Sequence, residues 1–246
     1  MSLGRSVVVA ISCLVAGAAA AADSPTAGIG VVFQTEFNGA LGRLDKNERE
    51  LLYTKSVYTD EVVHTGPHSS TALLFLDKTR LQVGANSDVV LDRYVYDPGS
   101  NIGNVAVNFS SGIFRFVTGH MKNKDGYDLK TPSGVMAIRG TKLIIYVDEK
   151  GNTITYVEVG EATAKSCGGK KADVPAGYSA VVPIDCSGVT VVPGNVTPPD
   201  PAVVADLQVP QDLSDALNLL DNLEPAAGPQ APPPPENDYR GNASPH

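Results

Sequence analysis

The sequence of 246 residues contains no tryptophan, only three cysteines and four histidines, and 6% aromatic residues. Positive charge is also scarce, with 19 Lys and Arg against 27 Asp and Glu, and no basic patch is visible along the chain. This balance argues against nucleic acid as a partner, because phosphate contacts need clustered cations. The hydrophobic content of 42% nevertheless lies in the range of globular proteins, so the chain is expected to fold.

Motifs that commonly carry catalysis are missing as well. The sequence has no G-x-S-x-G elbow, no H-E-x-x-H, no P-loop and no G-x-G-x-x-G. His64 and His68 lie near Asp60 and Glu61, but the intervening Gly-Pro pair at 66–67 indicates a turn and favours exposed loop histidines over a metal site. We therefore predict a non-enzymatic protein with no catalytic residue, no metal and no cofactor.

Isolated acids and tyrosines offer only weak alternatives. Asp88, Asp92 and Asp97 lack the glycine and spacing of an EF-hand loop and are expected to face solvent. Polysaccharide hydrolysis by Asp88 and Asp92 would need two carboxylates about 5 to 9.5 Å apart in a groove. Tyr94 and Tyr96 would be able to stack on sugar or peptide, although half-buried strand positions also attract tyrosine.

Residues 1–22 have the pattern of a secretory signal peptide. Arg5 precedes an apolar run at 7–16, and small residues lead to an A-x-A cleavage site at 20–22. A membrane anchor is disfavoured because a span needs roughly 20 apolar residues. A lipoprotein acylated at Cys13 is a further alternative with a poor lipobox. We expect no membrane span in the mature chain.

Cleavage would leave an even pair of cysteines, Cys167 and Cys186, in an exported chain. An oxidising compartment favours a disulfide between them, which would contribute about 3 kcal/mol in the chain-entropy model. Two unpaired buried thiols are the alternative. A zinc site is less favoured, because neither cysteine has another Cys or His beside it at ligand spacing.

The last part of the chain differs in composition from the rest. Residues 193–246 hold 12 of the 18 prolines and eight acids against one base, so we predict a Pro-rich, acidic, disordered tail after a folded domain at 23–192. Within the tail, residues 212–223 place apolar side chains on one stripe of a short amphipathic helix. This stripe would contact the domain, contact a partner, or fray in solvent. Its members are Leu213, Ala216, Leu217, Leu220 and Leu223.

Between Gly28 and Val192 the sequence consists of short β-rich runs punctuated by glycine, which predicts an all-β barrel, jelly roll or solenoid. Lys46–Tyr53 is the only internal helix candidate and would equally suit a loop. A turn at 148–152 with Gly151 predicts a hairpin. The expected strands are Thr71–Leu76, Thr79–Val83, Asp88–Leu91, Val105–Phe109, Ile113–Val117, Thr141–Val147 and Thr153–Val159.

A set of short motifs recurs in order along these strands, over roughly Val57 to Val182. The motif residues are Thr65, Gly66, Asp77, Thr79, Ser87, Gly112, Arg115, Gly119, Thr131, Pro132, Arg139, Gly140 and Thr141. With their neighbours they resemble the FecR domain, a bacterial periplasmic module, and the pairing of Thr131-Pro132 with Arg139-Gly140-Thr141 is the most specific part. The resemblance implies a single β-solenoid or jelly-roll-type domain.

The best-known proteins of this family are transmembrane regulators with a cytoplasmic sigma-factor-binding segment. Here the resemblance begins about 35 residues after the predicted cleavage site, and we expect no cytoplasmic segment or membrane span before it, so the chain is similar to stand-alone exported FecR-domain proteins. We expect a bacterial periplasmic or secreted module that binds a protein or cell-envelope component, in extracytoplasmic signal sensing. A structural or adhesive envelope scaffold is the alternative.

The motif residues themselves are interpreted mainly as structural. Gly112, Gly119 and Gly140 suit tight corners, and Pro132 restricts the residue before it to extended geometry. Arg139 would donate hydrogen bonds to corner carbonyls. Alternatively, Arg139 or Arg115 would pair with a carboxylate of a partner. Together with Leu213, Leu217 and Leu220, Arg139 is the candidate partner contact.

Overall fold

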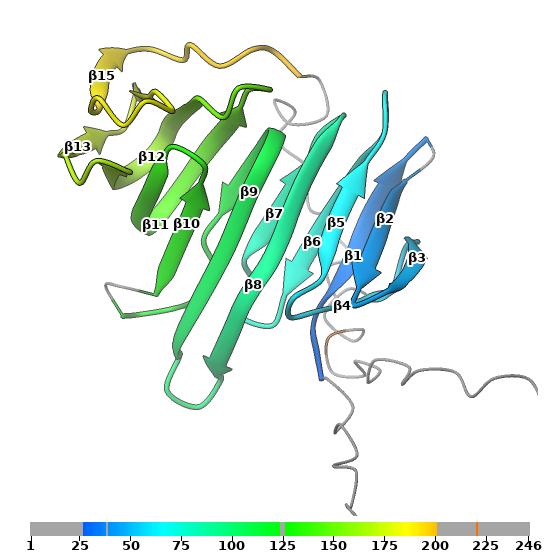
Figure 1. The fold of residues 1–246 in the computed structure, drawn as a ribbon. Helices are drawn as coiled ribbons and strands as arrows, with labels where there is room; N and C mark the ends of the chain where they lie inside the picture. The colour runs from blue at the N-terminus through cyan, green and yellow to red at the C-terminus, as the bar shows by residue number, and fades with distance from the viewer. Residues whose placement is uncertain (1–26, 38, 124–125, 201–219, 221–246) are drawn as a thin grey trace, which may run out of the picture.

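The computed structural model describes residues 27–37, 39–123, 126–200 and 220, and it consists of strands joined by turns (Figure 1). The predicted all-β class is confirmed. Within the described residues no helix is long and apolar enough to cross a membrane. The strands are β1 (Gly28–Glu36), β2 (Ala40–Leu44), β3 (Asn47–Leu51), β4 (Ser56–Tyr58), β5 (Val62–Thr65), β6 (Ser70–Phe75), β7 (Arg80–Val83), β8 (Ser87–Asp97), β9 (Ile102–Val117), β10 (Tyr127–Thr131), β11 (Gly134–Val147), β12 (Thr153–Ser166), β13 (Lys171–Pro175), β14 (Tyr178–Val182) and β15 (Thr190–Pro193).

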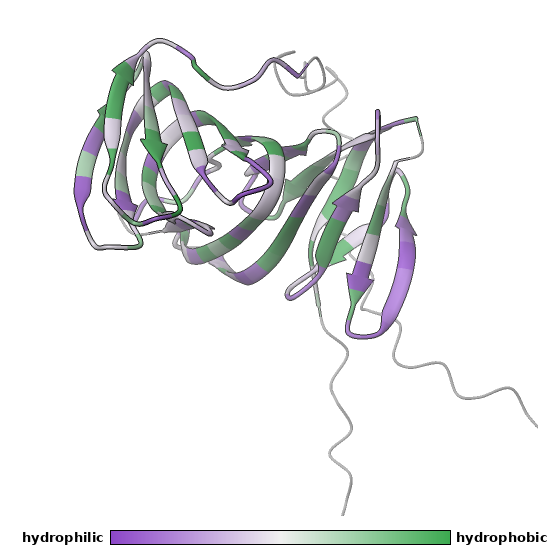
Figure 2. Ribbon diagram, turned by 45° about the horizontal axis from the view of Figure 1, so that its top comes forward, coloured by the Kyte–Doolittle hydropathy of each residue, from purple (hydrophilic) through white to green (hydrophobic). Residues whose placement is uncertain are grey.

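The strands form one continuous sheet that folds over a single main core. Strands β4, β1, β6 and β7 make one group, β3, β2, β5 and β8 make a second, and both groups join β9. Val32 and Leu73 of the first group share a buried cluster with Val63 and Val89 of the second. The two groups therefore face each other across this core. Apolar and polar residues alternate along the strands, as a sheet with one buried face requires (Figure 2).

Three long strands, β9, β11 and β12, change partners along their length. Residues 102–111 of β9 pair with β8, whereas residues 112–117 pair with β11 and, in part, with β7. Strand β11 divides in the same way between β10 and β9, and β12 divides between β13 and β14. Each long strand contains one glycine of positive φ at the point where its partners change. These glycines are Gly112, Gly140 and Gly160.

The structure corrects one sequence prediction and extends another. Lys46–Tyr53 is not a helix, because Asn47–Leu51 forms β3 against β2 and places Leu51 in the core. The predicted runs Val105–Phe109 and Ile113–Val117 are both strands, but they are halves of the single strand β9. The hairpin turn at 148–152 is confirmed, with a 3.0 Å hydrogen bond from the Asp148 N–H to the Asn152 carbonyl.

The predicted disulfide is also confirmed. Cys167, just after β12, is bonded to Cys186, just before β15, with their Cα atoms 5.1 Å apart. The bond ties the end of the long strand β12 to the loop that follows β14. The predicted signal peptide at 1–22 and nearly all of the predicted tail at 193–246 lie outside the described residues.

Candidate interaction surface

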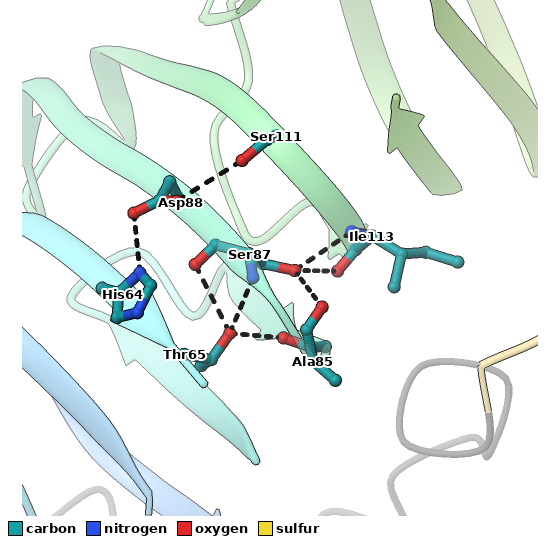
Figure 3. A network of polar contacts seen from close by, with 8 residues as sticks. His64, Thr65, Ala85, Ser87, Asp88, Ser111 and Ile113 are labelled. Atoms are coloured by element: carbon teal, nitrogen blue, oxygen red, sulfur yellow. Dashed lines mark hydrogen bonds and ion pairs between the residues drawn. The ribbon is translucent and has the colours of Figure 1, made fainter. Parts of the chain in front are cut away.

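Two motif hydroxyls join the ends of three strands inside the domain. The Thr65 hydroxyl donates to the Gly84 carbonyl at 2.6 Å and accepts the Ser87 N–H at 3.1 Å. The Ser87 hydroxyl donates to the Ala85 carbonyl and accepts the Ile113 N–H at 3.1 Å (Figure 3). Thr65 and Ser87 are completely buried, so both side chains stabilise the fold and neither is accessible to a partner.

On the outer side of the same strands, a histidine, an aspartate and a serine lie together (Figure 3). His64 Nδ1 is 2.8 Å from Asp88 Oδ1, and the Ser111 hydroxyl donates to Asp88 Oδ2 at 3.4 Å. A nucleophilic serine would need the histidine as its base, whereas this hydroxyl contacts the carboxylate. The arrangement is therefore an exposed hydrogen-bonded His–Asp contact with a serine beside it, and it lacks the geometry of a catalytic triad.

The other residues considered for a metal point in different directions. Glu61 is fully buried and binds Arg49, so it faces away from His64, while His68 lies in an exposed turn. Among the residues that the structure describes, no group of three or more His, Cys, Asp or Glu side chains is placed to hold a metal ion.

A second buried network surrounds the motif residue Asp77. Its carboxylate accepts hydrogen bonds from the hydroxyls of Thr79 at 2.6 Å, Tyr127 at 2.6 Å and Tyr94 at 3.0 Å. The N–H of Gly119 donates to Thr79 and Tyr127. Burial, and after it the charge of Asp77, raises the pKa of both tyrosines well above the ordinary value of 10.0, which keeps them protonated as donors. The network links β8, β10 and the turn before β7.

The remaining motif residues lie near the bends of β9 and β11. Arg115 forms a 2.6 Å ion pair with Glu158 and is almost fully buried. Thr141 is buried, and its hydroxyl accepts the N–H of Arg139 at 3.1 Å and donates to the Glu161 carbonyl at 3.3 Å. Arg139 has an exposed side chain opposite Glu161 on β12.

Around the turn between β10 and β11, the motif residues are again held by hydroxyls. The Thr131 hydroxyl donates to the Gly134 carbonyl at 3.2 Å and accepts from Thr153 at 2.9 Å. Pro132 is exposed in this turn, where it lines an open groove on the outer face of β9 to β12.

The groove has a volume of about 600 Å³. Its lining residues are Asn108, Ser110, Lys130, Thr131, Pro132, Gly134, Val135, Lys165, Ser166 and Cys167. Strand pairing places Asn108, Lys130, Val135 and Lys165 side by side across four strands, and Lys171 of β13 continues the row. Lys130 also holds Asp92 at 2.6 Å.

We call Lys130, Lys165 and Lys171 the lysine row. It is a cationic, polar surface with Val135 at its centre, and it suits an acidic segment of a partner. This patch could not be predicted from the sequence, because the three lysines come from three different strands and only the pairing register brings them together. Lysines that lie this far apart in the sequence do not form a basic run.

Of the predicted leucine stripe, one member lies within the described residues. Leu220 is 3% exposed and packs in a cluster with Val31, Phe33, Ala72 and Leu74 of β1 and β6. Leu213 and Leu217 lie outside the described residues.

Taken together, these features define an all-β domain whose motif side chains are largely used internally and whose outer face carries an open groove beside the lysine row. The FecR protein family matches residues 61–164. The match spans β5 to β11 and most of β12, and it leaves out β1–β4 and β13–β15. The resemblance stated from the sequence motifs is confirmed.

Two crystal structures of a protein from Parabacteroides distasonis ATCC 8503, described as a “putative anti-sigma factor”, are each 12% identical to it with a TM-score of 0.43. Each alignment covers 55% of this chain and 60% of that chain, so it spans less than two thirds of that protein. No curated protein matches this chain.

Proposed function

We propose that this protein is an exported, non-enzymatic FecR-domain module that binds a protein partner in extracytoplasmic signal sensing. The observation that carries the proposal is the use of the family's motif residues inside the fold. Thr65, Asp77, Thr79, Ser87 and Thr141 are buried and hydrogen-bonded within the domain. The motif thus maintains a rigid scaffold, and recognition falls to the side chains on its outer face.

Export is supported by the disulfide and by the pattern of residues 1–22. A bond between Cys167 and Cys186 persists in an oxidising compartment and not in a reducing cytosol. The protein recovered from the periplasm or the medium should begin at Asp23, which N-terminal sequencing measures. Recovery of uncleaved protein from the cytoplasm alone would refute export.

The lysine row is the proposed contact surface, because it presents the exposed ammonium groups of Lys165 and Lys171 on rigid strands beside an open groove, next to the Lys130–Asp92 ion pair. Exposed charge pairs contribute little individually and act mainly on specificity and on the rate of encounter. A partner with an acidic segment would meet several of these groups at once. Binding is therefore expected to weaken as the salt concentration rises.

Crosslinking pull-down from envelope fractions tests this proposal with the full chain. The variant Lys165→Glu/Lys171→Glu reverses two charges of the row, and the control Lys46→Glu/Lys55→Glu reverses two exposed charges on either side of β3, away from the groove. We expect the first variant to recover about tenfold less partner, since loss and reversal of two exposed pairs approaches 1.4 kcal/mol. The control should match the native protein.

Three results would contradict the proposal. Equal recovery by both variants would exclude the lysine row as the contact surface. Recovery that depends only on residues 193–246 would favour the envelope scaffold. Absence of any specific partner in the crosslinked fraction would exclude a protein-binding role.

A further inference from the structure

The outer face of β1 and β6 is apolar and covered, although it points away from the main core. Val32 and Leu73 belong to the main cluster, whereas their neighbours Val31 and Leu74 lie on the opposite face of the sheet. Val31 is 1% exposed and Leu74 is 2% exposed. An outward apolar pair is buried to this extent only when another part of the molecule covers it.

Among the described residues, Leu220 packs on this face from a part of the chain far from β1 and β6 in sequence. It forms one cluster with Val31, Phe33, Ala72 and Leu74, and the half-buried Leu76 adjoins them. Since Leu220 is itself 3% exposed, its side chain and the face bury each other. The contact joins the N-terminal strand of the domain to a residue within the predicted amphipathic helix.

Chain geometry permits this contact within a single molecule. Asp200 lies beside the turn after β7, where its carboxylate accepts the Ala85 N–H at 3.4 Å. Strand β7 adjoins β6, which adjoins β1, so the face lies roughly 10 Å away at the usual strand spacing. The 19 residues at 201–219 reach up to roughly 60 Å when extended, which is ample.

We propose that the outer face of β1 and β6 is a docking site for residues 212–223 of the same chain, with Leu220 as its anchor. The spacing of Leu213, Leu217 and Leu220 puts them on one stripe of a helix, which matches a flat apolar face. A short helix is marginal alone, and docking on β1 and β6 supplies the tertiary contact that stabilises it.

Docking in the same chain has a functional consequence that goes beyond the proposed function. The tether gives residues 212–223 a high effective concentration at the face, so a separate partner competes poorly for it. Release of the segment would expose an apolar patch on β1 and β6. The docked segment thus keeps this face closed and fixes where the Pro-rich remainder of the chain departs from the domain.

The absence of tryptophan allows a direct test with the full chain. Leu220→Trp introduces a single reporter on the stripe, and Leu219→Trp places the same reporter beside the stripe as a matched control. We expect blue-shifted emission and several-fold weaker acrylamide quenching for Leu220→Trp than for Leu219→Trp. Adding Ala72→Arg to the docking face should abolish the difference.

A second measurement avoids the larger side chain. Leu220→Asp should expose the face and increase binding of an apolar dye several-fold, while Leu219→Asp should leave dye binding near the native level. Equal quenching of the two reporters, or equal dye binding by the two aspartate variants, would overturn the proposal. A blue shift that appears only at high protein concentration, with a dimer on size-exclusion chromatography, would overturn it in favour of a second copy.

Discussion

At the scale of single residues, the most consequential polar contact outside the motif hydroxyls is a buried carboxylate. Glu61 is fully buried, and Arg49 donates to both of its oxygens at 3.0 Å, while the Tyr58 N–H adds a third hydrogen bond. The same guanidinium contacts the Ser56 carbonyl and lies over the Tyr58 ring. Arg49 therefore connects β3, β4 and the residue before β5.

Burial raises the pKa of Glu61 above its ordinary value of 4.5, and the charge and hydrogen bonds of Arg49 partly oppose this rise. Because the folded state holds the proton more tightly than the unfolded chain, the contribution of Glu61 to stability is complete below 4.5. It is lost as the pH rises through the raised folded value.

Arg49→Met removes the charge and hydrogen bonds that oppose the rise in the pKa of Glu61. It should therefore lower the free energy of unfolding by about 2 kcal/mol at pH 7 and by less at pH 5. Urea unfolding at the two pH values measures this difference. Glu61→Gln in the same background should recover part of the loss at pH 7. Arg43→Met, at an exposed position on β2, should change stability by no more than about 0.5 kcal/mol. If Arg49→Met lowered the free energy of unfolding equally at pH 7 and pH 5, Arg49 would not act through the ionised carboxylate of Glu61.

At the scale of strands, the glycines of the long strands decide how the sheet folds over. Gly112 has φ of +106° at the bend of β9, where the pairing passes from β8 to β11. A Cβ at Gly112 would lie 2.1 Å from Oγ and 2.5 Å from Cα of Ser87. The hydroxyl of Ser87 also holds the Ile113 N–H, so the bend and the motif serine depend on each other.

Gly112→Ala should therefore destabilise the domain by about 3 kcal/mol, from the positive φ together with overpacking against the Ser87 backbone. Gly66→Ala is the matched control, because the nearest atom that its Cβ would meet is 4.0 Å away. Denaturant unfolding monitored by circular dichroism measures both. Ser87→Ala should not rescue Gly112→Ala, since the backbone contact remains. Equal stability of the two alanine variants would show that β9 can bend without glycine at 112.

Many of the strands and turns are predictable from the sequence, because β-rich runs and glycine positions are local properties. The runs Val105–Phe109 and Ile113–Val117 are strands, and the turn at Gly151 forms a hairpin. The continuity of β9 through Gly112 was not predictable, since it depends on partners distant in sequence. For Lys46–Tyr53, the local pattern allows a helix or a loop, but pairing of Asn47–Leu51 with β2 outweighs it and makes a strand.

The candidate site depends even more on residues that are distant in sequence, so less of it could be predicted. The disulfide was predictable from an even cysteine count, and the structural use of Thr65 and Ser87 follows from motif positions at strand ends. The lysine row was not predictable, because Lys130 and Lys165 are 35 residues apart and meet only through the register of β10, β11 and β12. Register is set by the whole core, not by any local pattern.

At the scale of the whole molecule, β9 makes the two strand groups one cooperative unit. It pairs with β7 of one group and with β8 of the other, and the main core takes side chains from both. Neither group can therefore separate without breaking pairing to β9. The terminal strands β3 and β15 pair on one side only and should open first.

This architecture predicts that a small loss in one region spreads over the entire core. Ile145 lies on β11 opposite Phe114 of β9 and is fully buried, so Ile145→Val should cost about 1 kcal/mol. Native-state hydrogen exchange should then show the same decrease of about 1 kcal/mol at the slowest amides of β6 and of β8. A decrease in exchange free energy confined to β9 and β11 would mean that the two groups unfold separately. Strand β9 would then connect two independent folding units.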